Sequence, residues 1–430
     1  MPTDLAGSVL PLSLGLLGAF YSVVLIAKWP GRALTILVPV LMWPQLLRVG
    51  PLPLQQVVTL LLVVGLLIGA RRAKAPRWLV PGVIALSVLL IASHYLHVES
   101  VFTLPSEARN SMLALLLNLW LVVALAKARP EPATVFRAVG LGSIAFAVYV
   151  VAFGQSHGGR VDLEGLNPNS AGHAAALGVA ALAATAMVTG HRRWLLAAVA
   201  PLSLVYLAQS RGAVVVLIAG AATAWVLSHS GAKRAAAVLL GAAATGLLWG
   251  PAAHFTQDNL LAERSAEFVS TDARTRLLQV AGRLIVEHPV FGIGYARFPD
   301  YSQPAVGLAL NTHNEWIRIA VEVGLPAVLL LLFVVGSPLA RRLAQQRPVP
   351  LLAGRAAKAV LAAGCVSWMF SNVMTDLRVA LPVWVAAAMA WSLVAHPEAK
   401  QASAAHGAQV PGSDSALATD WLHDQPERAQ

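Results

Sequence analysis

Apolar runs of roughly 15–22 residues recur along almost the whole chain, separated by short polar breaks. Because a helix rises 1.5 Å per residue, a run of about 20 residues crosses the roughly 30 Å hydrocarbon core of a bilayer. Irregular backbone cannot face lipid, since its polar groups would lack hydrogen-bond partners. Charged residues make up 12% of the chain, about half the usual share in soluble domains. The pattern predicts an all-α polytopic membrane protein and excludes a soluble enzyme, a coiled coil and a disordered protein.

Thirteen segments are candidate spans. They are residues 9–27, 33–48, 54–70, 78–96, 110–126, 135–153, 170–188, 195–209, 213–229, 235–252, 314–335, 358–375 and 379–395. Segment 33–48 has only sixteen residues and contains Pro39 and Pro44. Counted as a span, it gives thirteen helices and an outside N-terminus. Counted as a broken or re-entrant segment, it gives twelve helices with both ends inside, the number we favour.

Basic residues sort the polar breaks into two alternating kinds. Cytoplasmic loops carry an excess of Lys and Arg, which assigns 71–77, 127–137, 189–193, 230–234 and 341–358 to the cytoplasm. The alternate breaks, at 97–109, 154–169, 210–212, 251–312 and 375–378, hold no lysine and then face outside, and the longest is 251–312. We expect four parts: transmembrane helices in 1–252, a large outer loop at 253–312 with an amphipathic helix at 272–288, transmembrane helices in 313–395, and a disordered cytoplasmic tail at 396–430.

Ten arginines and no lysine lie on the predicted outer side. They are Arg109, Arg160, Arg211, Arg264, Arg274, Arg276, Arg283, Arg297, Arg318 and Arg378. The planar guanidinium binds phosphate or carboxylate through two parallel hydrogen bonds, so a set made only of arginine indicates anion recognition. The alternative is a genome that prefers arginine codons, with these side chains as interfacial anchors.

Arg211 lies in the sequence A-Q-S-R-G-A between two short predicted spans, where Gly212 allows a tight turn. The short spans place Arg211 slightly below the outer surface. A charge at helix-centre depth costs about 2.5–3.5 kcal/mol, so such a residue usually faces a functional cavity or a partner.

Segment 270–294 predicts an amphipathic helix with a cap between Ser270 and Asp272, ended by His288 and Pro289. Its apolar face at i, i+3, i+4 spacing is formed by Leu277, Val280, Ala281, Leu284 and Ile285, and Arg274 and Arg276 lie in its first turns. The alternative is a helix on the membrane surface with its arginines toward lipid headgroups.

His313 follows Thr312, which forms a T-x-x-E capping box with Glu315, so His313 is expected as the first residue of a helix. The helix dipole disfavours the imidazolium form there, and a general base needs neutral imidazole. Glu315, Arg318 and Glu322 share one stripe, which predicts an ion pair. His313 points away from that stripe, toward a cavity or simply toward the interface.

Asn167 and Asn169 belong to an N-P-N turn that opens the predicted span at 170–188. Two alternatives are open at this turn. The asparagines bind a sugar hydroxyl, or they cap the helix.

Together these motifs carry a resemblance. The turn N-P-N, the turn Q-S-R-G-A, the helix that starts D-A-R and ends E-H-P-V-F-G-I-G, and H-N-E-W-I-R-I-A-V-E-V-G-L-P follow one another within 165–326. In this order the chain resembles the O-antigen ligase and polymerase superfamily of bacterial envelope glycosyltransferases.

The resemblance implies a GT-C-like helical fold in the bacterial inner membrane, with the large loop and the active site on the periplasmic face. It implies an inverting O-antigen ligase that moves a glycan from undecaprenyl diphosphate to a sugar hydroxyl of lipid A-core. The resemblance also implies that Arg211 and Arg274 bind the diphosphate, with Arg276 as an additional candidate, and that His313 is the general base. The expected substrate-binding set is completed by Arg160, Arg318, Glu315, Asn167 and Asn169.

Neither a cofactor nor a metal is expected, since the outer segments hold no D-x-D or H-E-x-x-H motif and Cys365 is the only cysteine. Arginines would stabilise the leaving diphosphate instead.

Expected partners are the two glycolipid substrates and membrane lipids, and no nucleic acid. The alternatives are an O-antigen polymerase, a protein O-oligosaccharyltransferase and, from another class, a flippase or transporter. A single dominant loop favours the ligase, and the lack of repeated halves disfavours a transporter.

Overall fold

The computed structural model describes residues 17–43, 48–49, 52–97, 99–157, 160–162, 168–228, 271–340 and 348–393. The candidate span 235–252 and the predicted tail at 396–430 lie outside these residues. In chain order the helices are Leu17–Lys28, α2 (Pro30–Met42), α3 (Leu54–Gly69), α4 (Leu79–Tyr95), α5 (Pro105–Ala128), α6 (Pro132–Phe153), α7 (Pro168–Thr189), α8 (Arg193–Ala197), α9 (Val199–Ala208), α10 (Arg211–Ser228), α12 (Thr271–Glu287), α13 (Phe298–Val306), α14 (Glu315–Glu322), α15 (Leu325–Ala340), α16 (Pro348–Ser367) and α17 (Leu377–Leu393). Proline opens α2, α5, α6 and α7, because its fixed φ suits the first turn of a helix.

The helical membrane class is confirmed. Of the described helices, α5, α6, α7 and α10 are long and apolar enough to cross a bilayer, and seven further apolar helices are shorter. Helix α2 has 13 residues and contains Pro39, so it rises about 20 Å, less than the hydrocarbon core. The number of spans, twelve or thirteen, stays a prediction.

Two predicted spans are divided in the structure. Segment 195–209 forms α8 and α9. Segment 314–335 forms α14 and α15, separated at Gly324, whose φ of 105° ends the first helix. Short antiparallel hairpins also occur, β1 (Arg48–Val49) with β2 (Leu52–Pro53) and β3 (Gln155–His157) with β4 (Arg160–Asp162). The all-α prediction missed them because two- or three-residue strands leave no periodic pattern.

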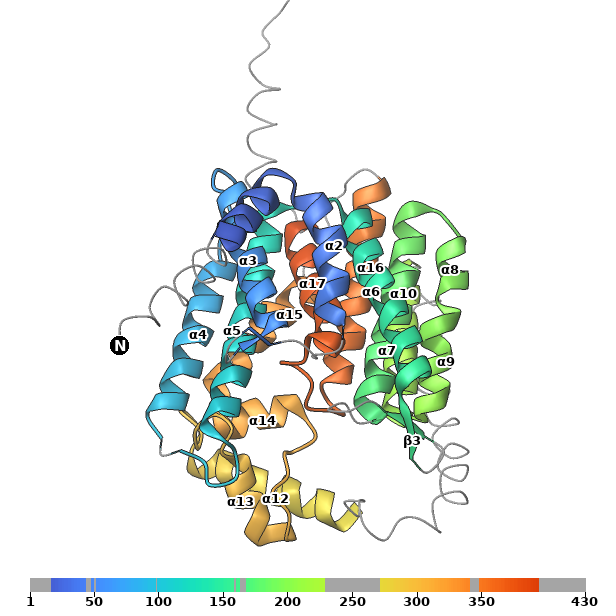
Figure 1. Cartoon of the computed structure of the whole chain (residues 1–430). Helices are drawn as coiled ribbons and strands as arrows, with labels where there is room; N and C mark the ends of the chain where they lie inside the picture. Colours follow the sequence, from blue (N-terminus) through green and yellow to red (C-terminus); the bar gives the residue numbers. More distant parts are fainter. Residues whose placement is uncertain are drawn as a thin grey trace, which may run out of the picture. The chain divides into compact units, whose positions relative to one another are not determined.

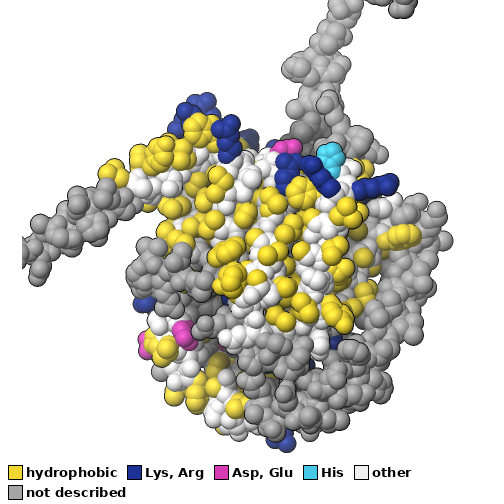
Figure 2. Space-filling view, turned by 45° about the vertical axis from the view of Figure 1, so that its right-hand side comes forward, with side chains coloured by type: hydrophobic (Ala, Val, Ile, Leu, Met, Phe, Trp, Pro, Cys, Tyr) yellow, Lys and Arg dark blue, Asp and Glu magenta, His cyan; other side chains and the backbone are white. Residues whose placement is uncertain are grey.

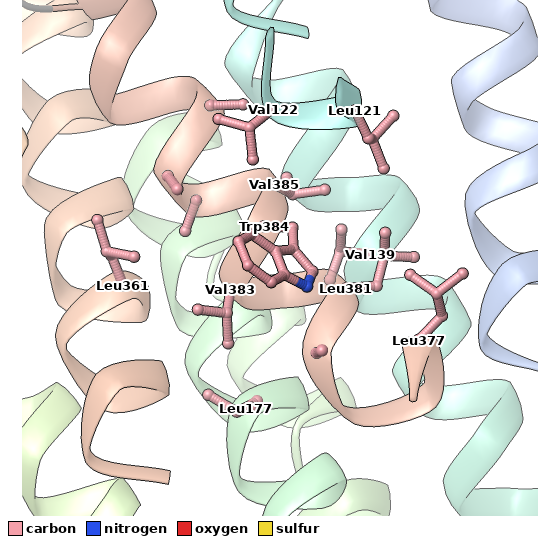
Figure 3. Close-up of a cluster of buried hydrophobic side chains, with 14 of the residues drawn as sticks. Leu121, Val122, Val139, Leu177, Leu361, Leu377, Leu381, Val383, Trp384 and Val385 are labelled. Atoms are coloured by element: carbon pink, nitrogen blue, oxygen red, sulfur yellow. The ribbon is translucent and has the colours of Figure 1, made fainter. Parts of the chain in front are cut away.

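Helix α17 forms the centre of the bundle and contacts α2, α5, α7 and α16. All its residues from Leu377 to Trp391 are buried. Figure 3 shows Trp384 among aliphatic side chains of several helices. Its indole N–H donates to the carbonyl of Met374 at 3.2 Å, and that of Trp391 donates to the carbonyl of Val334 at 2.7 Å. These bonds satisfy the polar edge of each buried tryptophan.

Helices α12, α13 and α14 form a separate block at one end of the bundle, which we call the α14 end (Figure 1). The amphipathic helix predicted at 272–288 is confirmed as α12. Its apolar face, Leu277, Ala281 and Leu284, is buried against α13 and α14. This face is therefore covered by protein, and it is not available for the alternative, a helix lying on the membrane surface.

Polar and apolar side chains separate along the bundle. Figure 2 shows hydrophobic side chains over its flank and Lys and Arg gathered along the rim away from the α14 end. A bundle with an apolar flank and a basic rim at one end is typical of a helical membrane protein.

Candidate active site

His313 lies in the connection that leads into α14, before the helix begins. Asn314 is the N-cap, and its Oδ1 accepts the backbone N–H of Ile317 at 3.1 Å. Thr312 Oγ1 donates to the carbonyl of Asn314 at 2.7 Å. The predicted capping box and the predicted helical position of His313 are therefore wrong. The reason is that the carboxylate of Glu315 is engaged elsewhere, so it does not reach back to Thr312.

The backbone of His313 adopts the left-handed conformation, with a φ of 54°. Residues other than glycine occupy this region at a cost of about 1–3 kcal/mol and do so mainly where the surroundings impose it, often at functional sites. The hydrogen bonds of Thr312 and Asn314 fix the chain on both sides. The structure thus holds His313 in one strained orientation.

The electrostatic surroundings of His313 favour its neutral form. The side chain is half-buried. Burial lowers its pKa first, and the positive charge of Arg274 lowers the pKa further. A neutral imidazole accepts a proton at neutral pH, which is what a general base must do.

Arg274 of α12 is the charged residue that acts on this histidine. It lies in the first turn of α12, is exposed, and is close enough for its charge to act on His313. Arg276 is also exposed, two residues further along. Because Leu277 faces the block interior, the packing of α12 directs this end of the helix toward the His313 connection. Two residues that the sequence predicted for one site are therefore brought together.

Arg211 is the first residue of α10 and is half-buried. The turn before it depends on Gln209, which has a φ of 48°, so the prediction that Gly212 makes the turn is wrong. Gly212 is helical, and its small size serves another purpose. A Cβ at this position would clash with Nε2 of His173.

The turn that follows α16 lies between the Arg211 region and the His313 region. On one side, the carbonyl of Trp368 accepts the N–H of Glu315 at 2.8 Å, and the N–H of Met374 donates to Glu315 Oε1 at 2.7 Å. On the other side, Ser367 Oγ lies 2.8 Å from Nδ1 of His173. Arg211 and His313 therefore flank one segment, residues 367–374.

Glu315 and Arg318 form the ion pair that their spacing predicted. Arg318 Nε lies 2.6 Å from Glu315 Oε2, and the guanidinium also stacks 5.7 Å over the ring of Tyr295. Glu315 is 0% and Arg318 7% exposed, so both side chains support α14 from inside. Their predicted contact with substrate stays a prediction.

The remaining predicted residues are only partly described. Asn169 is the second residue of α7 and is half-buried, which confirms that the N-P-N turn opens a helix. Arg160 lies in β4, but its side chain and the whole of Asn167 lie outside the described residues. Within the described ranges, no group of three or more His, Cys, Asp or Glu is arranged to hold a metal ion.

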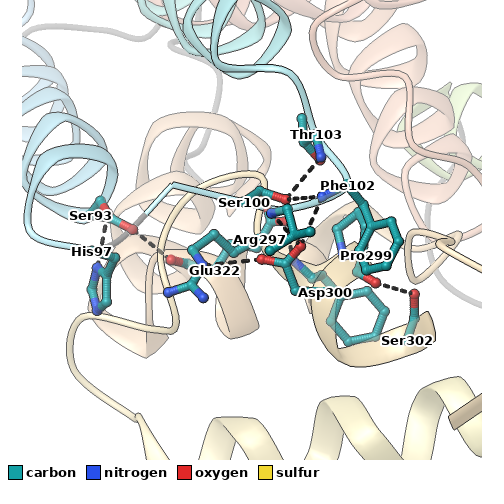
Figure 4. Close-up of polar contacts among 12 residues, drawn as sticks. Ser93, His97, Ser100, Phe102, Thr103, Arg297, Pro299, Asp300, Ser302 and Glu322 are labelled. Carbon is teal, nitrogen blue, oxygen red and sulfur yellow. Dashed lines mark hydrogen bonds and ion pairs between the residues drawn. The ribbon is translucent and has the colours of Figure 1, made fainter. Parts of the chain in front are cut away.

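Asp300 of α13 holds the loop that joins α4 to α5 (Figure 4). Its Oδ1 accepts from Ser100 Oγ at 2.8 Å and from the backbone N–H groups of Val101 and Phe102 at 3.0 and 3.2 Å. Its Oδ2 lies 3.3 Å from Nε of Arg297. This clasp ties the α12–α14 block to the bundle. Sequence reasoning missed it because the partners are about 200 residues apart.

Asp300→Ala should loosen this loop selectively. Loss of a charged acceptor shared by three donors is expected to lower the local opening free energy by about 1–2 kcal/mol, because water replaces part of the bonding at the exposed amides. Amide exchange at Val101 and Phe102 should become about 5–30-fold faster. Glu99→Ala removes an exposed carboxylate from the same loop and should change nothing. Equal exchange in both variants would contradict the clasp.

The fold and the site together define the class of protein. It is a helical membrane protein in which a half-buried histidine and several arginines lie at one end of the helix bundle. Residues 196–332 match the O-antigen ligase family model, a region that includes Arg211, Arg274, Arg276 and His313. The match confirms the family that the motifs indicated and supports a function of the O-antigen ligase or polymerase type. A search of curated proteins finds none that matches the chain.

Proposed function

We propose that this protein is an O-antigen ligase of the bacterial inner membrane. It transfers a glycan from undecaprenyl diphosphate to a sugar hydroxyl of lipid A-core, at a site on the periplasmic face. The observation that carries the proposal is the position of Arg274 near the half-buried His313, where burial and then the arginine charge lower the pKa of the imidazole. Support for the orientation comes from the basic rim at the opposite end of the bundle (Figure 2).

In the proposed reaction, His313 takes the proton from the acceptor hydroxyl as its oxygen attacks the anomeric carbon of the donor. The bond between that carbon and the diphosphate oxygen breaks, so the configuration inverts and undecaprenyl diphosphate leaves. Negative charge grows on the leaving diphosphate. Arg211 and Arg274, with Arg276 as a further candidate, stabilise this charge through guanidinium hydrogen bonds.

The proposed reaction needs no metal ion, as the family resemblance implies. The arginines supply the positive charge that a divalent cation would otherwise bring to a diphosphate. Arg160 and Asn167 precede α7 and Asn169 lies in its first turn, and we assign all three to contacts with the glycan.

The decisive experiment combines the purified protein, an undecaprenyl-diphosphate-linked glycan, lipid A-core and a chelator. Glycan attached to lipid A-core in the presence of the chelator is the expected result. Lengthening of the lipid-linked glycan itself would identify a polymerase instead, and glycan on an added acceptor protein would identify an oligosaccharyltransferase. No covalent product, together with movement of the donor across a vesicle membrane, would establish a flippase and overturn the proposal.

A further inference from the structure

A buried histidine lies between the start of α10, where Arg211 is located, and the segment 367–374, which contacts Glu315 of α14. His173 is 1% exposed and belongs to the first turns of α7. Its Nδ1 lies 2.8 Å from Ser367 Oγ and 3.1 Å from Ser371 Oγ. Both serines belong to the segment 367–374, so one edge of the imidazole is bound to the segment that also contacts Glu315.

The opposite edge of the imidazole rests against α10. Gly212 has room for no side chain because Nε2 of His173 occupies the space of a Cβ. One residue earlier in α7, a Cβ added at Gly172 would lie 2.6 Å from the Cβ of Ser210. The first turns of α7 therefore contact both neighbours of Arg211, Ser210 on one side and Gly212 on the other.

These contacts join the two halves of the site. We infer that His173 is a positioning residue that sets where Arg211 lies relative to His313. It does so by holding the start of α10 and the segment 367–374 at a fixed separation. The inference rests on the proposed function, in which Arg211 binds the lipid diphosphate and His313 activates the acceptor.

An apolar side chain at position 173 would fill the same space, but it would form no directional hydrogen bonds to the segment 367–374. Most of α7 packs through alanine, glycine and other small residues, and its neighbours are close enough for an aliphatic residue to complete the interface. A buried imidazole needs hydrogen-bond partners, and here they come from a single segment, Ser367 and Ser371. Such a satisfied buried polar network fixes one arrangement, whereas an aliphatic contact tolerates sliding.

The test measures Michaelis constants separately for the lipid-diphosphate donor and for the acceptor in the full-length protein. His173→Leu removes the serine contacts, and His173→Asn keeps an amide near the position of Nδ1. We expect His173→Leu to raise the donor KM about 10- to 100-fold, in line with the effect of small displacements of positioning groups. The acceptor KM should change less than threefold, and His173→Asn should recover most of the loss.

Gly212→Ala supplies an independent arm, because the new methyl group pushes against His173 and displaces the start of α10. Its donor KM should rise as in His173→Leu. Combination with His173→Asn removes Nε2, so the double variant should bind donor better than Gly212→Ala alone. Gly336→Ala, at a glycine of α15 with open space around it, is the matched control and should behave as the unmodified protein.

The outcomes separate this inference from the function on which it rests. Equal rises in donor and acceptor KM, or additive losses in the double variant, would overturn the positioning role and leave only a packing role. An unchanged donor KM in His173→Leu would overturn it as well. Unchanged transfer by Arg211→Ala would instead overturn the proposed function, whatever the His173 variants do.

Discussion

His313→Asn should reduce glycan transfer by about 10²- to 10⁴-fold, the usual contribution of a general base. Asparagine is the informative replacement because it tolerates the left-handed backbone that His313 adopts, with its φ of 54°. The variant thus keeps the local fold and removes only the group that accepts the proton. The measurement is the initial rate of transfer to lipid A-core at saturating donor.

The control for this experiment is the stability of the same variant. The melting temperature of His313→Asn in detergent should stay close to that of the unmodified protein, since a half-buried side chain is replaced without a change in backbone conformation. A stable His313→Asn protein that transfers glycan at the normal rate would remove His313 from the proposed mechanism.

Arg274→Ala should reduce the rate of transfer by about 10²- to 10³-fold, comparable to the loss of one donor that stabilises transition-state charge. It should also change the pH dependence. Arg274 lowers the pKa of His313, because a nearby cation disfavours the imidazolium form. Without this cation the pKa rises, so the acidic limb of the kcat/KM profile moves to higher pH.

Arg274→Lys separates the two effects. Lysine keeps the positive charge, so the acidic limb should stay in place, but it lacks the planar fork that binds a phosphate bidentately, so the donor KM should rise. Arg283→Ala is the matched control on the same helix, since that side chain is 66% exposed and lies 3.8 Å from Glu287. An unmoved acidic limb in Arg274→Ala would show that the cation does not act on the base.

Local sequence patterns predicted much of this structure correctly. The spacing of Leu277, Ala281 and Leu284 predicted α12 and its buried face, and the i, i+3 spacing of Glu315 and Arg318 predicted their ion pair. Both depend on contacts within one or two helical turns, which sequence spacing determines. The single-helix prediction for 314–335 was wrong, because apolar composition alone did not show that the chain turns at Gly324.

The class of protein follows from the sequence alone, because runs of apolar residues long enough to cross a bilayer leave helices as the available structure. The sequence also indicated which arginines and which histidine were candidates. How these residues are held could be seen only in the folded chain. Glu315 accepts a hydrogen bond from the backbone of Met374 rather than capping its own helix, and His173 packs against Gly212. These contacts join residues that are tens of positions apart, and their geometry depends on how whole helices pack, which no local periodicity records.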